Sequence, residues 1–278
     1  MKNLREIVNT DSNADNAIHA SIHPEDDTGK SGSGGGIYPN AIEESYIRRK
    51  GDFLYNEENK SFHQKLVNHY SNFTSEHKDN LKDYSEGSNF LNSYLWNKHN
   101  KTKMEPEVFD NVAKKKQFYN EQSSNLDKAL KTHKTPEAFT VYSGTQNDPR
   151  KIKNKEGIVH HPAYLSTSLD NEIAHDFSHY NSKKETWGKG TNKKNLHVFK
   201  IDVPKGHYGA YIDHVGNYGG QHEFILPRGL NLKYNHTTKE DKYANDFIDN
   251  LGVNINDKPY QEIGKKYIIH THHMDIVK

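Results

Sequence analysis

Three short segments of the chain combine hydroxyl, amide or carboxylate side chains with strand-forming neighbours. They are Phe139-Thr-Val-Tyr-Ser-Gly144, Pro162-Ala-Tyr-Leu-Ser-Thr-Ser168 and Tyr218-Gly-Gly-Gln-His-Glu-Phe-Ile-Leu-Pro-Arg-Gly229. A fixed carboxylate such as Glu223 can stabilise a positive charge that develops beside it during a reaction. Taken alone, each segment also fits a structural role without chemistry. The first fits a strand end with a turn, the second a half-buried strand, and the third a solvated start of an edge strand. Their order along the chain favours one shared site.

Together, the three segments resemble the R-S-E class of mono-ADP-ribosyltransferases, a family that includes C3-like bacterial toxins and bacteriophage enzymes. In this family the first strand ends in aromatic-Arg-Gly, the second carries Ser-Thr-Ser, and the third follows a loop ending in Gln-x-Glu or Glu-x-Glu. Ser166-Thr167-Ser168 and Gln221-His222-Glu223 match the second and third patterns. Upstream runs also resemble the family's N-terminal helices: Leu81-Lys-Asp-Tyr84, Asn89 to Leu95, and Leu126 to Leu130. The resemblance covers roughly residues 60 to 235, the span of a catalytic domain.

The resemblance implies that NAD is a substrate and that no metal is needed. It implies that Glu223 stabilises the oxocarbenium at C1′ and hydrogen-bonds the ribose 2′-hydroxyl. A preorganised charge in a dry site lowers such a barrier by several kcal/mol. Ser166 is expected to orient Glu223, and Thr167 and Ser168 are expected to line the same strand.

The expected NAD contacts lie on the first strand and on the helix after the second. Tyr142, Ser143 and Gly144 occupy the place of the family's aromatic-Arg-Gly. Phe177, or else Tyr180, lies where the family often supplies an aromatic ring beside the nicotinamide.

Ser143 departs from the family pattern. The family's Arg holds the NAD phosphates with an always-charged, two-pronged guanidinium. A Ser cannot supply that charge, so NAD binding weakens by several kcal/mol unless another group compensates. Three explanations stay open: Arg150 or Lys151 reaches the pyrophosphate, NAD binds in an altered geometry, or the domain is an inactive relative that serves as a binding or virion protein.

Gln221 stands where the family holds its acceptor-selecting residue. A Glu there generally goes with arginine acceptors, because a carboxylate can pair with a guanidinium. Gln offers an amide donor and acceptor to a neutral partner. The resemblance therefore implies an Asn, Gln or Thr side chain of a host protein, or a base of RNA or DNA. With water as the acceptor, the chain would instead be an NAD glycohydrolase.

Helices are expected first along the chain and strands afterwards, which indicates an α+β fold. Two helical faces follow from residue spacing; they are Phe62, Leu66, Tyr70 and Phe73, then Phe90, Leu91, Tyr94 and Leu95. Ser124-Asn125-Leu126-Asp127 is typical of a capping signal and predicts a third helix that begins there.

Six short runs rich in β-forming residues follow His133. They are Phe139 to Tyr142, Ala163 to Ser168, Leu196 to Val203, Glu223 to Leu226, Leu230 to Tyr234 and Tyr267 to His273. Gly, Pro, Asn and Lys clusters separate them, and a short helix is expected from Asn171 to Phe177. The family resemblance implies N-terminal helices packed on two small, mostly antiparallel sheets that form an NAD cleft.

The expected organisation is a disordered tail over 1–40, ending in a Gly- and Ser-rich linker, and a single domain over 41–278. Within that domain, 41–133 is expected to be helical and 134–278 to be rich in strands.

The bulk composition excludes several classes of function. Among 278 residues, 38 Lys and Arg stand against 37 Asp and Glu, so no global field draws the chain to nucleic acid or to a membrane surface. The chain has no cysteine, which excludes disulfides, Cys-ligated zinc and thiol nucleophiles. No apolar run approaches the roughly 18 residues that span a bilayer, so we expect a protein made in or delivered to a host cytoplasm. The Cys-free, Asn- and Lys-rich composition also suits a phage-encoded enzyme that modifies its host.

The chain has 19 histidines, and two clusters raise the possibility of a metal site. These clusters are His160-His161 and His270-Thr-His272-His273. No His-Glu-x-x-His helix accompanies them, and adjacent side chains on a strand point to opposite faces. They are therefore predicted to be surface or interface histidines.

Overall fold

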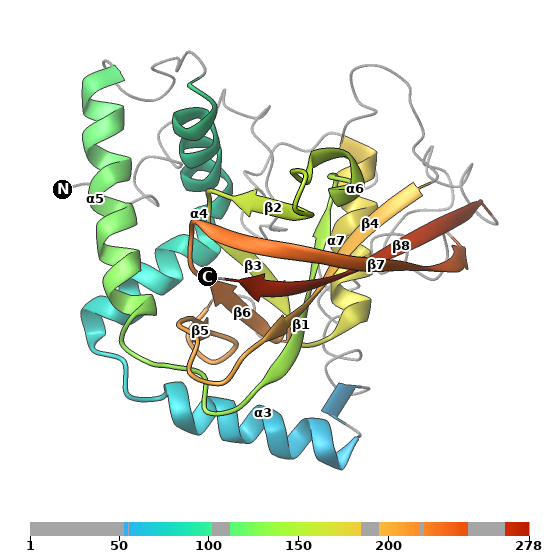
Figure 1. Cartoon of the computed structure of the whole chain (residues 1–278). Helices are drawn as coiled ribbons and strands as arrows, with labels where there is room; N and C mark the ends of the chain where they lie inside the picture. The colour runs from blue at the N-terminus through green and yellow to red at the C-terminus, as the bar shows by residue number, and fades with distance from the viewer. Residues whose placement is uncertain are drawn as a thin grey trace, which may run out of the picture.

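The computed structural model describes residues 53, 54, 56–101, 112–184, 195–216, 220–243 and 265–277, with the backbone alone for 180–184. The predicted tail lies outside these residues. Within them, the longer helices come first and most of the strands follow, as Figure 1 shows. The fold is α+β, as the sequence predicts.

Three helices precede the first strand: α3 (Glu57–Tyr70), α4 (Ser75–Asn100) and α5 (Val112–Leu130). The Asn56 carboxamide oxygen accepts two backbone N–H groups at the start of α3, and Thr74 caps α4 in a similar way. Both predicted helical faces are confirmed, although Phe73 lies just after the end of α3. Six of their eight side chains are buried: Leu66, Tyr70, Phe73, Leu91, Tyr94 and Leu95. Phe62 is partly buried and packs against the core that they join. Phe90 also packs against that core.

The predicted start of the third helix is wrong. α5 already begins at Val112, so Ser124 lies inside the helix. Tyr119, Ser123 and Leu126 are all buried and lie on one face at helical spacing. Burial of that continuous face outweighs the local capping signal at Ser124.

The strands form one sheet in the order β2-β7-β8-β4-β1-β3-β6-β5. Their bounds are β1 Phe139–Thr145, β2 Ile158–His161, β3 Leu165–Ser168, β4 Asn195–Val203, β5 Ala210–Tyr211, β6 Glu223–Leu226, β7 Leu230–Tyr243 and β8 Lys266–Val277. The pairings are antiparallel except for β4 with β8. The six predicted runs all fall on strands, whereas β2, β5 and the second half of β7 were not predicted.

Two separate sheets were expected, and the structure joins them instead. The junction is narrow, because β1 and β3 are in register at Tyr142 and Ser168 alone. On one side of the junction lie β2, β7, β8, β4 and β1, and on the other lie β3, β6 and β5. The expected halves therefore exist as two parts of one continuous sheet.

Helix α7 (Asn171–Lys184) follows β3 and runs past the predicted end at Phe177. It packs against β1, β3 and β4. The short helix α6 (Pro149–Ile152) lies between β1 and β2. These connections bring the ends of β1, β3 and β6 and the helices α4 and α7 around one region.

The prediction that the C-terminal histidines lie at the surface or at an interface is wrong for two of them, which are buried within the described fold. His270 and His272 are 6% and 0% exposed. Both lie on β8, which is covered on its two edges by β7 and β4. A strand in the interior of a sheet presents at least one buried face, and these alternate residues share it.

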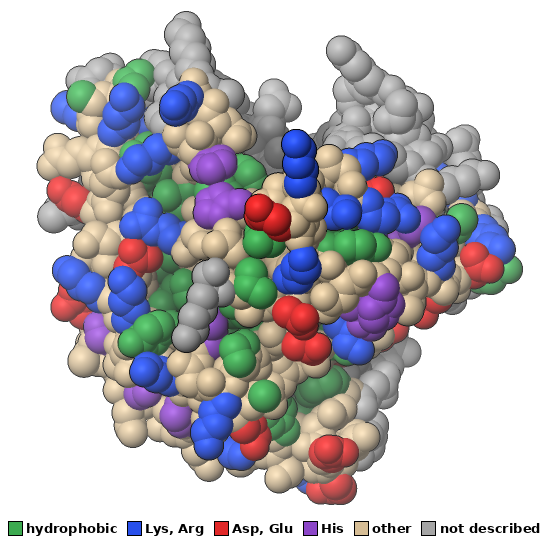
Figure 2. All heavy atoms as spheres, in the orientation of Figure 1, with side chains coloured by type: hydrophobic (Ala, Val, Ile, Leu, Met, Phe, Trp, Pro, Cys, Tyr) green, Lys and Arg blue, Asp and Glu red, His purple; other side chains and the backbone are tan. Residues whose placement is uncertain are grey.

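Charged side chains of both signs are interspersed over the face drawn in Figure 2. This distribution agrees with the formal net charge of +1. Among the described residues, no helix is both long enough and apolar enough to cross a bilayer.

Candidate active site

A cavity of about 360 Å³ opens where β1, β3 and the start of β6 meet α4 and α7. It collects every predicted site residue except Arg150. The lining includes Tyr142, Ser143, Gly144, Ser166, Thr167, Ser168, Phe177, Gln221 and Glu223. Segments far apart in the sequence therefore form one site.

Glu223 is the first residue of β6 and is in register with Ser168 on β3. Ser166 lies two residues along from Ser168, so its side chain is a diagonal neighbour of Glu223 on the same face. Burial raises the pKa of Glu223 to about 7, and the charge of Asp213 adds to the rise. A hydrogen bond from Ser166 works in the opposite direction and lowers that pKa. The carboxyl is thus poised to change its charge near neutral pH.

A chain of hydrogen bonds connects α4 to this carboxyl. The Asn92 side-chain amide donates to the Tyr84 hydroxyl (3.2 Å), which lies 3.1 Å from the Ser166 hydroxyl. Because burial raises the pKa of Tyr84, its hydroxyl keeps its proton at neutral pH. Because the Tyr84 oxygen accepts a hydrogen bond from Asn92, its O–H can donate one to the Ser166 hydroxyl. The Ser166 O–H can in turn donate to the Glu223 carboxylate.

Tyr84 and Asn92 were missed as site residues from the sequence. Both lie in runs that resemble the family's N-terminal helices, but nothing in those runs indicates a role in the site. A buried Tyr and Asn eight positions apart on a helix give no local signal of the carboxyl that they reach.

The other hydroxyls of the site hold backbone atoms. Ser143 Oγ donates to the Ser166 carbonyl (2.9 Å), Thr167 Oγ1 to the Phe224 carbonyl (2.6 Å), and Ser168 Oγ to the Gln221 carbonyl (2.6 Å). Ser168 Oγ also accepts the Asp170 N–H at the start of α7. These contacts fix β3 against its neighbours and hold Gln221 at the cavity.

Gly144 lets α7 approach β1 closely. A Cβ atom at this position would lie 2.4 Å from the Ala174 carbonyl oxygen and 2.5 Å from the Ser178 nitrogen. Both are backbone atoms of α7, so no side-chain rotation relieves the clash. The glycine expected beside NAD therefore has a packing role as well.

The segment that carries Gln221 is shaped from within the protein. Asp213 Oδ1 accepts the N–H groups of Gly220 (2.9 Å) and His222 (2.8 Å). His222 has φ of +49°, a left-handed conformation that is uncommon outside glycine. Its side chain is fully buried. Gln221 therefore faces the cavity, whereas its neighbour His222 points into the core.

The described lining residues include no Lys or Arg. Arg150 lies at the start of α6, outside the lining, and its guanidinium holds Asp148 through Nε–Oδ1 and Nη2–Oδ2 contacts of 2.8 Å each. Lys151 is exposed on the same short helix. Ser143 itself is only 7% exposed.

A sequence model of the ADP-ribosyltransferase exoenzyme family matches residues 59–258. No curated protein sequence gives a match. Among solved structures, the Vis toxin, an ADP-ribosyltransferase from Vibrio splendidus, superposes with a TM-score of 0.50 at 16% identity, over 86% of this chain and 90% of that chain. Its likeness shows the same fold.

Two further structures give slightly lower scores. Plx2a, an ADP-ribosyltransferase toxin from Paenibacillus larvae, has a TM-score of 0.49 at 22% identity, over 80% of this chain and 96% of its own. The C3 exoenzyme of Clostridium limosum has a TM-score of 0.48 at 17% identity, over 80% and 94%.

Proposed function

The chain belongs to the ADP-ribosyltransferase exoenzyme family, and we propose that it transfers ADP-ribose from NAD to a non-arginine acceptor on a macromolecule, with release of nicotinamide. The family supports NAD-dependent ADP-ribosyl transfer in general. The identity of the catalytic residues and of the acceptor class is the proposal.

The observation that carries it is the position of Glu223, a carboxyl at the wall of a cavity large enough for part of a dinucleotide. In the proposed reaction the C1′–N bond breaks, and its electron pair leaves with nicotinamide. The ribose becomes an oxocarbenium, which the ionised Glu223 stabilises at close range. The acceptor then attacks C1′ and loses its proton.

Ser166 acts on this reaction through Glu223. Its hydroxyl donates to the carboxyl and receives support from Tyr84 and Asn92. A carboxylate held by a fixed donor needs little reorganisation when the oxocarbenium forms. Tyr142 and Phe177, which line the same cavity, are proposed to contact the NAD rings.

The pyrophosphate needs donors other than the family's Arg. Residues with hydroxyl and amide side chains line the cavity near Ser143: Thr145, Gln146 and Asn147. We assign phosphate binding to this neutral set. Arg150 lies outside this set with its guanidinium bound to Asp148, so Arg150→Gln is expected to leave the NAD affinity nearly unchanged.

Gln221 is proposed to select the acceptor. Its side chain lines the cavity beside Glu223, and its backbone carbonyl is held by Ser168. An uncharged amide can donate to and accept from a carboxamide, a hydroxyl or a nucleobase. It cannot neutralise a guanidinium, so arginine acceptors are disfavoured.

The test uses NAD labelled in its adenylate part, incubated with the protein and a cell lysate, followed by mass-spectrometric mapping of the labelled sites. Transfer to Asn, Gln or Thr residues, or to nucleic acid, is expected. Gln221→Glu is expected to move labelling toward arginine. Labelling of arginine by the unaltered protein would overturn the proposed acceptor class, and free ADP-ribose without lysate would assign a glycohydrolase.

Two observations favour the alternative, an inactive relative that serves as a binding or virion protein. They are Ser143 in place of the family's Arg and the absence of Lys and Arg from the described cavity lining. It predicts that NAD neither binds nor releases nicotinamide, with or without lysate. Binding of NAD without turnover, under all acceptor conditions, would also favour a binding protein over the transferase.

A further inference from the structure

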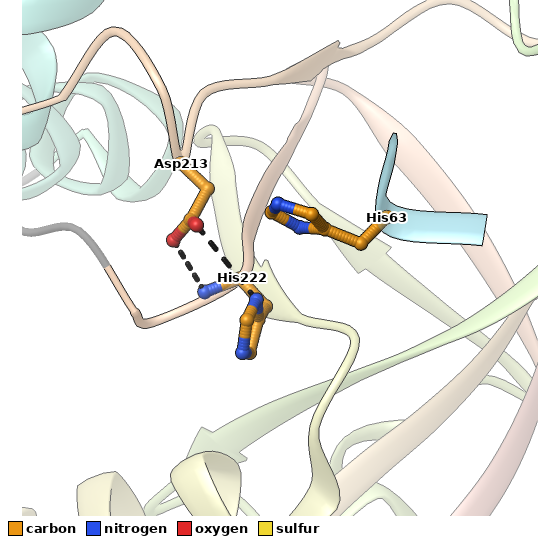
Figure 3. A group of neighbouring side chains, drawn as sticks. All are labelled: His63, Asp213 and His222. Carbon is orange, nitrogen blue, oxygen red and sulfur yellow. Dashed lines mark hydrogen bonds and ion pairs between the residues drawn. The ribbon is translucent and has the colours of Figure 1, made fainter. Parts of the chain in front are cut away.

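A second cluster of polar side chains lies behind the Gln221–Glu223 segment. It consists of His63 on α3, Asp213 after β5 and His222 before β6, drawn in Figure 3. One ligand atom from each residue lies within 4.8 Å of the others. Asp213 and His222 are buried and His63 is partly buried. None of the three residues lines the cavity that holds Glu223.

The atoms of the cluster have the spacing of a metal site. Asp213 Oδ2 lies 3.8 Å from His222 Nδ1, which is too long for a hydrogen bond. A tetrahedral zinc ion with bonds of about 2.0–2.2 Å separates its ligand atoms by about 3.3–3.6 Å. A small side-chain adjustment therefore suffices to bring both atoms to one ion.

The hydroxyl of a fourth residue lies beside the same point. The Tyr211 hydroxyl is 2.7 Å from His63 Nδ1 and 3.3 Å from His222 Nδ1. Two imidazoles and a carboxylate form a donor set of nitrogen and oxygen, which suits Zn²⁺ better than Ca²⁺ or Mg²⁺. The Tyr211 hydroxyl is hydrogen-bonded to His63 Nδ1, so an ion bound at that nitrogen replaces this one hydrogen bond. Asp213 Oδ1 is meanwhile oriented by the N–H groups of Gly220 and His222. Such bonds around a ligand are typical of metal centres.

The structure contains a second group of similar composition, Asp148 with His197 and His272. Here both Asp148 oxygens receive the Arg150 guanidinium, so a cation already occupies that carboxylate. The two imidazoles also contact each other, with His197 Nδ1 3.0 Å from His272 Nε2. A metal would have to displace both the Arg150 guanidinium and the contact between the imidazoles, whereas in the first group it replaces one neutral hydrogen bond, between His63 and Tyr211. The first group is therefore the better candidate.

We propose that His63, Asp213 and His222 bind one divalent transition metal ion, with Zn²⁺ the best match, next to the Tyr211 hydroxyl. The site ties the segment before β6 to α3. His222 belongs to the Gln-His-Glu motif, yet it points into this cluster while Gln221 lines the cavity. An ion here fixes His222 in its left-handed conformation, a backbone state that costs about 1 kcal/mol or more.

An effect of the ion on catalysis rests on the proposed function, because it acts through the position of Gln221 and Glu223. Binding of the ion does not. The test therefore reads out the metal itself, so that the metal site and the transferase can fail independently.

The experiment titrates Zn²⁺ into untagged, metal-stripped full-length protein by calorimetry, with Co²⁺ as a spectroscopic probe. Wild type is expected to bind one ion per chain, and Co²⁺ is expected to show the intense visible bands of a four-coordinate N/O site. His63→Gln is expected to weaken Zn²⁺ binding by roughly 100-fold or more, beyond the loss from removing an outer-shell partner. The matched control is His197→Gln in the second group, which is expected to retain the wild-type affinity.

Asp213→Asn is a second variant if His63→Gln fails to fold. It keeps an oxygen for the Gly220 and His222 N–H groups while removing the negative charge. Its binding is also expected to fall sharply. Wild type that binds no Zn²⁺, binding that survives both substitutions, or binding that is lost in His197→Gln would each overturn the proposal.

Discussion

At the scale of single residues, the site depends on a carboxyl that is partly buried at the wall of the cavity. Burial and the nearby Asp213 raise the pKa of Glu223 to about 7, while Ser166 holds that pKa down. The ionised form is the one that stabilises an oxocarbenium. The surroundings of Glu223 therefore set how strongly its carboxylate stabilises an oxocarbenium. They also set the pH above which the carboxylate is ionised.

The first prediction concerns the pH dependence of kcat/KM for nicotinamide release by the metal-stripped protein, in which Asp213 keeps its charge. Because the ionised carboxyl is the active form, kcat/KM should rise with pH through a midpoint of about 7. Ser166→Ala removes the contact that lowers the pKa and should move this midpoint upward. Thr167→Ala, whose hydroxyl contacts the Phe224 carbonyl instead, should leave it in place. A midpoint near 4.5 in wild type would contradict this environment.

The second prediction concerns stability. The folded-state pKa of Glu223 lies above its ordinary value of 4.5, so its contribution is complete below pH 4.5 and is lost as pH rises through about 7. A shift of this size corresponds to about 3 kcal/mol at most. The Gln side chain in Glu223→Gln does not titrate. The free energy of unfolding of this variant should therefore rise relative to that of wild type between pH 4.5 and 8. Urea denaturation of both proteins at several pH values measures this, and a constant difference would refute it.

At the scale of elements, the close approach of α7 to β1 sets the width of the cavity. Gly144 permits that approach, since a Cβ would meet two backbone atoms of α7. α7 carries Phe177 and β1 carries Tyr142, both of which line the cavity. The geometry of the site therefore depends on how these two elements pack.

The third prediction follows from this packing. Gly144→Ala should lower the free energy of unfolding by about 1–3 kcal/mol or more, because overpacking forces a backbone shift. Ser143→Ala, one residue away, removes a single hydrogen bond and should cost about 1 kcal/mol. Urea denaturation of both variants provides the comparison. Equal effects would mean that α7 moves away from β1 without strain.

How well the sequence predicted each element depended on how local its signal is. β4 and β6 were predicted closely because their apolar residues form compact runs. The second half of β7 is polar and exists through pairing with β8, which no local pattern reveals. The predicted start of α5 was wrong for a similar reason. Burial of Tyr119 and Ser123 stabilises helical turns that precede the local capping signal at Ser124.

The same distinction holds within the site. Ser166, Gln221 and Glu223 lie in short motifs and could be identified from order and spacing. Tyr84 reaches Ser166 across 82 positions of sequence, and Tyr211 reaches His63 across 148. Contacts of that range exist only after the fold forms, so the supporting residues could not be predicted from the chain alone.

At the scale of the whole molecule, the cavity lies at the narrow junction between the two parts of the sheet. β1 comes from one part, β3 and β6 from the other, and α4 adds Asn92 from the helical region. A dinucleotide bound here contacts all three. Since the formal net charge is +1, the chain adds no strong long-range attraction for an anionic ligand.

The fourth prediction uses this charge distribution. Because the described lining contains no Lys or Arg, the dissociation constant of NAD should change by less than roughly threefold between about 50 and 500 mM NaCl. Calorimetry with Glu223→Gln avoids turnover during the titration. A rise of tenfold or more would mean that a cation from Arg150, Lys151 or a part of the chain beyond the described residues reaches the phosphates.

Glu223 is proposed to drive cleavage of the nicotinamide–ribose bond, and the rate of nicotinamide release at saturating NAD and lysate reports on this step. Wild type is expected to release nicotinamide, and Glu223→Gln is expected to be slower by roughly 100- to 1000-fold, as for loss of one preorganised electrostatic contact. Circular dichroism and NAD binding check that the variant is folded and occupied. Equal rates in the two proteins would contradict the assignment of Glu223, and no release by wild type would contradict the transferase.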